Sequence, residues 1–234
     1  MPGAGILPIA NYDNKLYFLF GKEGPYDDVQ GYADFGGGSK EGETPFQNAV
    51  REGCEELSGF FGNERQVARW LRKDKIHTIK LVENKERTYT TFIVKADYDV
   101  NLPFYFKNHF QFMKKHLNHI VKNVDNGYFE KCEMRWLSFE DIKTHMHLFR
   151  GFYKNIVHQI CADEDEITRA FFKDCLNHHV VRVKPKSHKS HKSHTHNHHN
   201  NHNHHNHHSN KKSHTKGNKT TKRTRKTRKT RKNN

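Results

Sequence analysis

Three glutamates, Glu52, Glu55 and Glu56, lie close together in the sequence and directly follow Arg51. Residues three or four positions apart on an α-helix share a face, so a helix here would point the three carboxylates the same way. Neighbouring like charges repel, and such a cluster persists most readily where cations neutralise it. Ligand sets made only of oxygen favour Mg²⁺ or Mn²⁺. The spacing therefore predicts metal-assisted chemistry on phosphate groups.

The residues before this cluster predict the helix that carries it. Thr44 and Gln47 are spaced as a capping box, and Pro45 occupies the first helical position, which together mark a helix start. The helix is predicted to span residues 45–57, with Arg51 and Glu55 as an i,i+4 ion pair. A glycine-rich turn at residues 36–38 precedes it.

The run from residue 37 to 59 resembles the Nudix box, the signature of the Nudix hydrolase family, written G-x5-E-x7-R-E-U-x-E-E-x-G-U with U a bulky aliphatic. The matching positions are Gly37, Glu43, Arg51, Glu52, Glu55 and Glu56. The departures are Gly53, Ser58 and Gly59, which concern packing and the end of the helix rather than the acids. In its setting, the run is also similar to Nudix proteins of large DNA viruses, some of which remove mRNA caps.

The resemblance implies a Mg²⁺ or Mn²⁺ site and assigns its ligands. Glu52 and Glu56 are the first choices, and Glu55 is either a third ligand or the base that takes a proton from water. The backbone carbonyl of Gly37 is a further ligand, because glycine allows the backbone to approach an ion closely.

Neighbouring residues are expected to support these acids. Arg51 would orient the carboxylates during catalysis, while Gly38 and Glu43 would support the loop. Many members of the family add a carboxylate from outside the box, and Glu130 and Glu133 are the candidates in this sequence. The alternative for both is a surface ion pair with Lys131 or Arg135.

The order of the remaining elements predicts an α/β fold, a Nudix-type α/β/α sandwich with a mixed β-sheet. Alternating or apolar runs predict strands at residues 4–10, 15–20, 32–35, 76–82, 87–96 and 133–137. Helical periodicity predicts helices at residues 45–57, 104–124, 139–160 and 163–177. Residues 1–180 are expected to form this domain.

The basic charge of the chain lies in its last 50 residues. The net charge is +15, and from Pro185 onward the chain has 15 Lys or Arg and no Asp or Glu. This leaves 26 basic and 26 acidic side chains in residues 1–184, so the predicted domain is formally neutral. The His/Asn-rich and Lys/Thr/Arg-rich segment 185–234 has too few apolar residues to bury and is predicted to be a disordered tail.

The tail ends in a Lys-Thr-Arg repeat that is suited to phosphate or RNA contact. The residues expected to make these contacts are Lys222, Arg223, Arg225, Lys226, Arg228, Lys229 and Arg231. Such binding would weaken steeply with salt. A nuclear-localisation signal and a solvated tail without a role remain alternatives.

The expected function is Nudix pyrophosphohydrolysis, with the 5′ cap of mRNA as the substrate. One alternative keeps the chemistry but acts on a small molecule, a diphosphoinositol polyphosphate or dinucleoside polyphosphate. Another is a non-catalytic RNA-binding protein on the same fold. The four scattered cysteines, and the lack of any apolar run of about 20 residues, predict a cytoplasmic protein without a membrane partner, in the host cytoplasm if viral. The basic tail leaves the nucleus open.

Overall fold

The first two strands form a hairpin that runs through the centre of the sheet. Strand β1 (Gly3–Tyr12) and strand β2 (Lys15–Glu23) pair antiparallel, with Tyr12 opposite Lys15. The two turn residues, Asp13 and Asn14, have φ of 48° and 57°. Asp and Asn tolerate this left-handed conformation, which suits a tight hairpin turn. The hairpin predicted between residues 4 and 20 is therefore confirmed.

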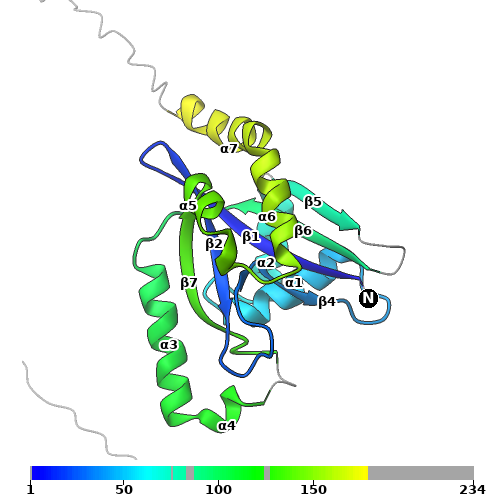
Figure 1. Ribbon diagram of the computed structural model, residues 1–234, viewed down its shortest axis with the longest axis vertical. Coiled ribbons are helices and arrows are strands. Elements are labelled where there is room, and N and C mark those ends of the chain that lie inside the picture. Colours follow the sequence, from blue (N-terminus) through cyan, green and yellow to red (C-terminus); the bar gives the residue numbers. More distant parts are fainter. Residues whose placement is uncertain (1, 75, 83–86, 124–126, 179–234) are drawn as a thin grey trace, which may run out of the picture. The chain divides into compact units, whose positions relative to one another are not determined.

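The computed structural model describes residues 2–74, 76–82, 87–123 and 127–178, with only the backbone described for 173–178. Within these residues the sheet has seven strands (Figure 1). The others are β3 (Tyr32–Ala33), β4 (Phe35–Gly38), β5 (Ile76–Val82), β6 (Thr88–Lys95) and β7 (Lys131–Ser138). The main order is β3-β2-β1-β6-β5, with β4 paired to β1 and β7 to β2. Strand β6 runs parallel to β1 and the other pairs are antiparallel, so the sheet is mixed, as predicted.

Helix α1 (Pro45–Glu56) begins and ends close to where the sequence predicts. Thr44 and Gln47 form the complete capping box, with Pro45 in the first turn. A Cβ at Gly53 would lie 2.5 Å from the Cδ1 atom of Ile6. Glycine at this position therefore lets the helix pack closely on the Ile6 side chain of strand β1.

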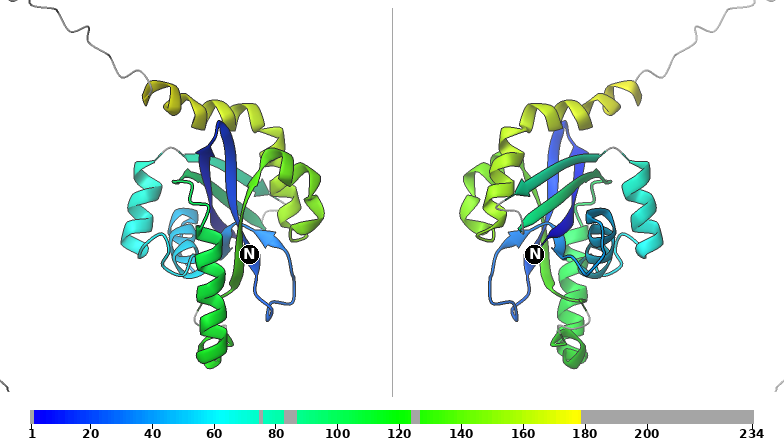
Figure 2. Two further views of the ribbon diagram at one scale, coloured as in Figure 1. Left: turned by 90° about the vertical axis from the view of Figure 1, so that its left-hand side faces the viewer. Right: turned by 90° about the vertical axis from the view of Figure 1, so that its right-hand side faces the viewer.

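Helices cover both faces of the sheet, as Figure 2 shows. On one face, Ala4 and Ile6 pack with residues of α1 and of α2 (Glu64–Lys73). On the other face, Leu7 and Ile9 pack with α5 (Phe139–Thr144), α6 (Tyr153–Ala162) and α7 (Glu164–His178). This alternation along one strand is the pattern of a sheet buried on both sides. The predicted α/β/α arrangement is confirmed.

Three helical segments differ from the prediction. Helix α2 was not predicted, although Asn63 and Gln66 form a capping box at its start. The predicted helix 104–124 is two, α3 (Leu102–His116) and α4 (Asn118–Val121), broken at Leu117, whose φ and ψ are −133° and 41°.

The predicted helix 139–160 is also wrong as a single element. It consists of α5, a short 3₁₀ segment (Met146–Leu148) and α6. The break occurs because the chain at Phe149 and Arg150 joins the sheet edge, where the Arg150 amide donates to the Tyr32 carbonyl at 3.1 Å. Hydrogen bonding to β3 thus overrides the helical pattern.

The predicted tail, residues 185–234, lies outside the described residues. Of the helices in the described part of the chain, none is both long and apolar enough to cross a bilayer.

Candidate active site

The Arg51 guanidinium lies between three glutamates of the predicted motif, Glu43, Glu52 and Glu55. Its Nε donates to Glu43 Oε1 at 2.8 Å and its Nη2 donates to Glu43 Oε2 at 3.0 Å. Its Nη1 lies 2.7 Å from Glu52 Oε1 and 3.2 Å from Glu55 Oε2. The hydrogen bonds from Arg51 lower the pKa of Glu43 to about 2. This is the orienting position expected for Arg51, and the i,i+4 pair with Glu55 is present.

Glu56 is held in a separate and deeply buried group of charges. Its Oε2 accepts from the Gly36 amide at 2.6 Å, and its Oε1 lies 3.2 Å from Lys131 Nζ. Lys131 also pairs with Glu23, whose Oε1 accepts from Arg150 Nη1 at 2.7 Å. Burial lowers the pKa of Lys131, but Glu56 and Glu23 outweigh this effect and hold it above its usual value. Burial raises the pKa of Glu56, and Lys131 opposes this rise. The ion pair with Lys131 thus holds Glu56 in place.

Strand β4 runs alongside the acids and is composed largely of glycine. A Cβ at Gly37 would lie 2.7 to 2.8 Å from the carboxyl atoms of Glu52. The Gly38 carbonyl accepts from Asn48 Nδ2 and from Arg51 Nη2, each at 3.0 Å. Glycine at position 37 is thus needed for the close approach of Glu52, and Gly38 connects the loop to α1.

The loop before β7 brings a fourth carboxylate to the cluster. A Cβ at Gly127, where φ is 66°, would lie 2.6 Å from Glu55 Oε2, so the loop passes directly over that acid. Burial and the negative charge of Glu52 raise the pKa of Glu130 to about 7. The charges of Glu23 and Glu55 add to this rise, whereas the positive charge of Lys131 opposes it. The negative charges of the cluster therefore act on the Glu130 carboxyl group.

Glu133, the other candidate, lies elsewhere. Its Oε1 accepts from Tyr32 Oη at 2.6 Å and from Arg135 Nε at 2.8 Å. Its Oε2 lies 3.4 Å from Lys107 Nζ. This is the ion pair with a neighbouring basic residue that the sequence left open, and it separates Glu133 from the other acids.

The cluster offers the right donors for a divalent cation. Its atoms are carboxylate oxygens, and burial raises the pKa of Glu52 while Arg51 opposes that shift. In the described part of the chain, no three Asp, Glu, His or Cys side chains converge as metal ligands do. Arg51 engages one oxygen of Glu52 and one of Glu55, and both oxygens of Glu56 are engaged, by the Gly36 amide and Lys131. Coordination therefore requires Glu56 to turn from Lys131. The residues fit Mg²⁺ or Mn²⁺ in type.

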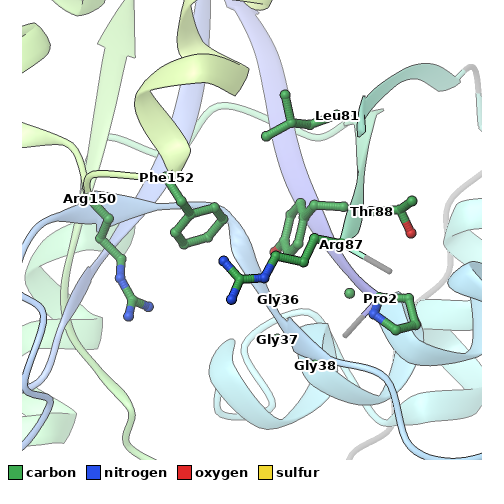
Figure 3. A pocket seen from close by; sticks show the side chains of 11 residues that line it. Pro2, Gly36, Gly37, Gly38, Leu81, Arg87, Thr88, Arg150 and Phe152 are labelled. Atoms are coloured by element: carbon green, nitrogen blue, oxygen red, sulfur yellow. The ribbon is translucent and has the colours of Figure 1, made fainter. Parts of the chain in front are cut away.

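A cavity of about 340 Å³ opens beside the same glycine strand (Figure 3). Gly36, Gly37 and Gly38 form one wall. The other walls include Arg87 and Tyr89 from the β6 side, and Arg150 and Phe152 from the segment before α6. A pocket of this size is within the range of small-molecule sites.

Sequence reasoning missed Glu23, Arg150 and the aromatic wall of the cavity. No local pattern marks them, because they come from separate parts of the chain and meet only in the folded structure. Lys131 was expected only as a surface ion-pair partner of Glu130 or Glu133. It is buried instead and pairs with Glu23 and Glu56. The predicted phosphate-contacting residues between 222 and 231 lie outside the described residues.

No model of a known protein family matches the sequence, and no curated protein is significantly similar to it. Among solved structures, a Nudix hydrolase from M. smegmatis is 17% identical, with 73% of this chain and 88% of that chain covered and a TM-score of 0.42. A C. elegans Ap4A hydrolase is 17% identical, with 72% and 99% covered and a TM-score of 0.44. A Nudix hydrolase from Nitrosomonas europaea is 15% identical, with 73% and 92% covered and a TM-score of 0.40. Two of these three structures are of Nudix hydrolases, but at these identities and TM-scores the case for the function of this chain rests on its own residues.

Proposed function

We propose that this chain is a divalent-metal-dependent hydrolase of the Nudix type that cleaves a diphosphate linkage. The observation that carries the proposal is the gathering of four carboxylates, from Glu52, Glu55, Glu56 and Glu130, beside a glycine strand. Their position suits neutralisation by a metal ion and work on an anionic substrate.

Each acid has a role in this proposal. Glu52 and Glu56 hold Mg²⁺ or Mn²⁺, and Glu55 is a third ligand or the group that takes a proton from the attacking water. A bound divalent ion supplies charge neutralisation for phosphate oxygens and a more acidic water. Arg51 keeps Glu52 and Glu55 in position, and Lys131 does the same for Glu56. Glu130 adds negative charge from the loop and serves as a further ligand or base.

Capped RNA is the substrate that we propose, cut within its 5′ triphosphate bridge to release a methylated guanosine diphosphate. The support is the basic segment 185–234, with 15 Lys or Arg and no acid to oppose them. Such a segment can hold a long anion close to the site. A diphosphoinositol polyphosphate or a dinucleoside polyphosphate is the alternative if the tail has no part in capture. Action on RNA is compatible with a cytoplasmic or nuclear protein.

The decisive experiment measures hydrolysis of capped RNA, dinucleoside polyphosphates and diphosphoinositol polyphosphates by the full chain, with and without Mn²⁺. Glu56→Gln should reduce turnover of the best substrate at least 100-fold, because a metal ligand contributes several kcal/mol to transition-state stabilisation. Glu41→Gln is the matched control, since Glu41 is an exposed acid of the loop before α1, and its turnover should equal that of the wild type. Turnover that is independent of metal or unaffected by Glu56→Gln would overturn the proposal. No turnover of any of these substrates would also overturn it and leave a binding protein as the alternative.

The role of the tail has its own test. Replacing the seven basic residues of the terminal repeat with serine, in the full-length chain, should raise the KM for capped RNA. It should also flatten the dependence of KM on salt, because each lost contact with single-stranded RNA removes about 0.7 from the log–log slope. Unchanged KM and slope for the RNA substrate would show that the tail has no part in substrate capture.

A further inference from the structure

Helix α2 has one apolar face and one basic face. Val67 and Leu71 are buried in the core that α2 shares with α1 and strand β1. Residues four, seven and eight positions apart share a side of a helix, and here they leave a row of basic side chains on the side opposite to the buried pair. All four are exposed: Arg65, Arg69, Arg72 and Lys73. We call this row the basic face of α2.

The charges of this face are not neutralised within the described part of the chain. None of its four side chains forms an ion pair there. The Cζ atom of Arg72 lies 5.1 Å from the centre of the Phe46 ring, a contact that orients the guanidinium without cancelling its charge. A hollow of about 390 Å³ is lined by these four side chains, without a carboxylate among its described lining residues. The domain is formally neutral, but its charge is locally positive here.

The spacing of the face suits an extended anion. Because an α-helix rises about 1.5 Å per residue, the seven steps from Arg65 to Arg72 cover about 10 Å. A single small anion cannot contact all of these groups, whereas a chain of phosphates can. Three of the four groups are guanidinium forks, which bind phosphate through two parallel hydrogen bonds. The face therefore fits a polyanion that carries phosphate groups.

The composition of the face favours a nucleic acid over other polyanions. None of the large exposed apolar side chains in the described residues belongs to α2. A helix that lies on a membrane requires such anchors, and protein interfaces usually have an apolar or aromatic centre. The basic segment 185–234 of this chain has the same sign of charge as the face and would be repelled by it. A sugar–phosphate backbone requires only the cations that the face provides.

The basic face lies one helix away from the acid cluster. In Figure 2, α2 lies at the outer side of the domain, and it packs against α1, the helix that carries the acids. One hollow of about 400 Å³ is lined by both Arg72 and Arg51. The same hollow also contains the carboxylates of Glu41, Glu43 and Glu64. A polyanion would therefore follow the outer side of α2 rather than enter this hollow.

We infer that the basic face of α2 binds the phosphate backbone of single-stranded RNA. The folded domain thus has an RNA-binding surface of its own, in addition to the basic segment 185–234. Its contacts are with phosphates, so they hold the strand without reading its sequence. The choice of RNA among nucleic acids rests on the proposed function, whereas the binding of a phosphate chain rests on the face alone.

Binding to RNA, measured without turnover, tests the inference. Fluorescence anisotropy on the full chain in EDTA would measure the Kd for a labelled, uncapped, single-stranded RNA at several salt concentrations. Replacing Arg65, Arg69 and Arg72 together with glutamine should raise this Kd at least tenfold at about 0.1 M salt. The log–log slope against salt should fall by about 2, because each lost phosphate contact removes about 0.7. Replacing the same three residues with lysine should preserve the slope, because the charges remain.

A second triple variant controls for the loss of charge. Lys15→Gln, Lys80→Gln and Arg169→Gln together remove the same charge from exposed positions of β2, β5 and α7. This variant should keep the wild-type slope. Equal changes in the two glutamine variants would overturn the inference, because they would show a general effect of net charge.

Two other results would overturn the inference. One is an unchanged Kd and slope in the α2 glutamine variant when its thermal unfolding matches that of the wild type. The other comes from vesicles that contain phosphatidylserine. If the α2 variant loses vesicle binding but keeps its affinity for RNA, the face binds a lipid surface instead.

The two proposals fail separately. If no diphosphate is hydrolysed but RNA binding depends on the three arginines of α2, the proposed catalysis is wrong and the RNA-binding face stands. If hydrolysis depends on Glu56 but RNA binding is indifferent to those arginines, the face is wrong and the catalysis stands.

Discussion

Two regions beside strand β4 differ in charge and in how the chain builds them. The acid cluster comes mainly from one helix, with Glu52, Glu55 and Glu56 within five residues of each other. The cavity beside the same strand is lined by two guanidinium groups, from Arg87 and Arg150, and its walls come from separate parts of the chain. A diphosphate ester requires both kinds of surface, since one region binds the cation that neutralises it and the other binds the anion itself. Because the two tasks lie in separate regions, substitutions in one region should leave the other intact.

The largest expected effect concerns the buried cation beneath the acids. Lys131→Met should lower the free energy of unfolding by about 3 to 5 kcal/mol, because Glu23 and Glu56 would be left buried without it. Urea unfolding measures this change. Lys143→Met is the control, since Lys143 pairs with Glu164 at the surface and such pairs contribute at most about 1 kcal/mol. Equal effects of the two substitutions would mean that Lys131 does not hold the cluster together.

Arg51 provides the second test, because it orients two of the proposed ligands. Arg51→Gln should weaken Mn²⁺ binding about 10- to 100-fold, the usual cost of removing a residue that positions metal ligands. Titration of Mn²⁺ followed by electron paramagnetic resonance measures the affinity directly. Arg65→Gln on the exposed side of α2 is the control and should bind Mn²⁺ like the wild type. A tighter Mn²⁺ affinity in Arg51→Gln would show that Arg51 competes with the metal rather than preparing its site.

The third test uses the pH dependence of stability to measure how strongly burial and the neighbouring acids raise the pKa of Glu130. The pKa of Glu130 is raised from 4.5 to about 7 in the folded chain. The folded chain holds the Glu130 proton more tightly than the unfolded chain does. The resulting stabilisation is fully present below pH 4.5 and is lost as the pH rises to about 7. Without divalent ions, stability should fall by about 1 to 2 kcal/mol over this range, with allowance for solvent screening.

Glu130→Gln should reduce that fall, with the remainder due to Asp34, Glu52 and Glu56, whose pKa values are also raised by burial. Glu140→Gln, at an exposed acid of α5, should leave the fall unchanged. Urea unfolding at pH 5 and pH 7.5 provides the comparison. A wild-type stability that rises over this interval would mean that Glu130 does not share the field of the other acids.

The smallest expected effect lies at the end of the helix that carries the acids. Ser58 has φ of 50°, and its hydroxyl is buried without a hydrogen-bond partner among the described residues. Ser58→Gly should raise the free energy of unfolding by about 0.5 to 1 kcal/mol, because glycine adopts this conformation without strain. Asn14→Gly, at φ of 57°, should gain less, since asparagine tolerates the left-handed region. Thermal unfolding separates the two, and a loss of stability in Ser58→Gly would contradict the explanation.

The same contrast explains what could be predicted from the sequence. The acid cluster depends on helical periodicity and on a capping box, and both are local properties that determine α1 wherever the helix packs. The break at Phe149 and Arg150 could not be predicted, because it depends on hydrogen bonding to β3, more than one hundred residues earlier. The cavity shares this limitation, since Arg87 and Phe152 meet only after the strands have paired.

Three ion pairs in series connect the cavity to the acid cluster, and they have a thermodynamic consequence. They join Arg150 to Glu23, Glu23 to Lys131, and Lys131 to Glu56. A ligand phosphate that attracts Arg150 would leave Glu23 more dependent on Lys131, and Lys131 would then hold Glu56 less firmly. Occupancy of the cavity and occupancy of the metal site would thus be coupled through one shared ammonium group. By reciprocity, an ion at Glu56 would strengthen phosphate binding by the same factor as the phosphate strengthens binding of the ion.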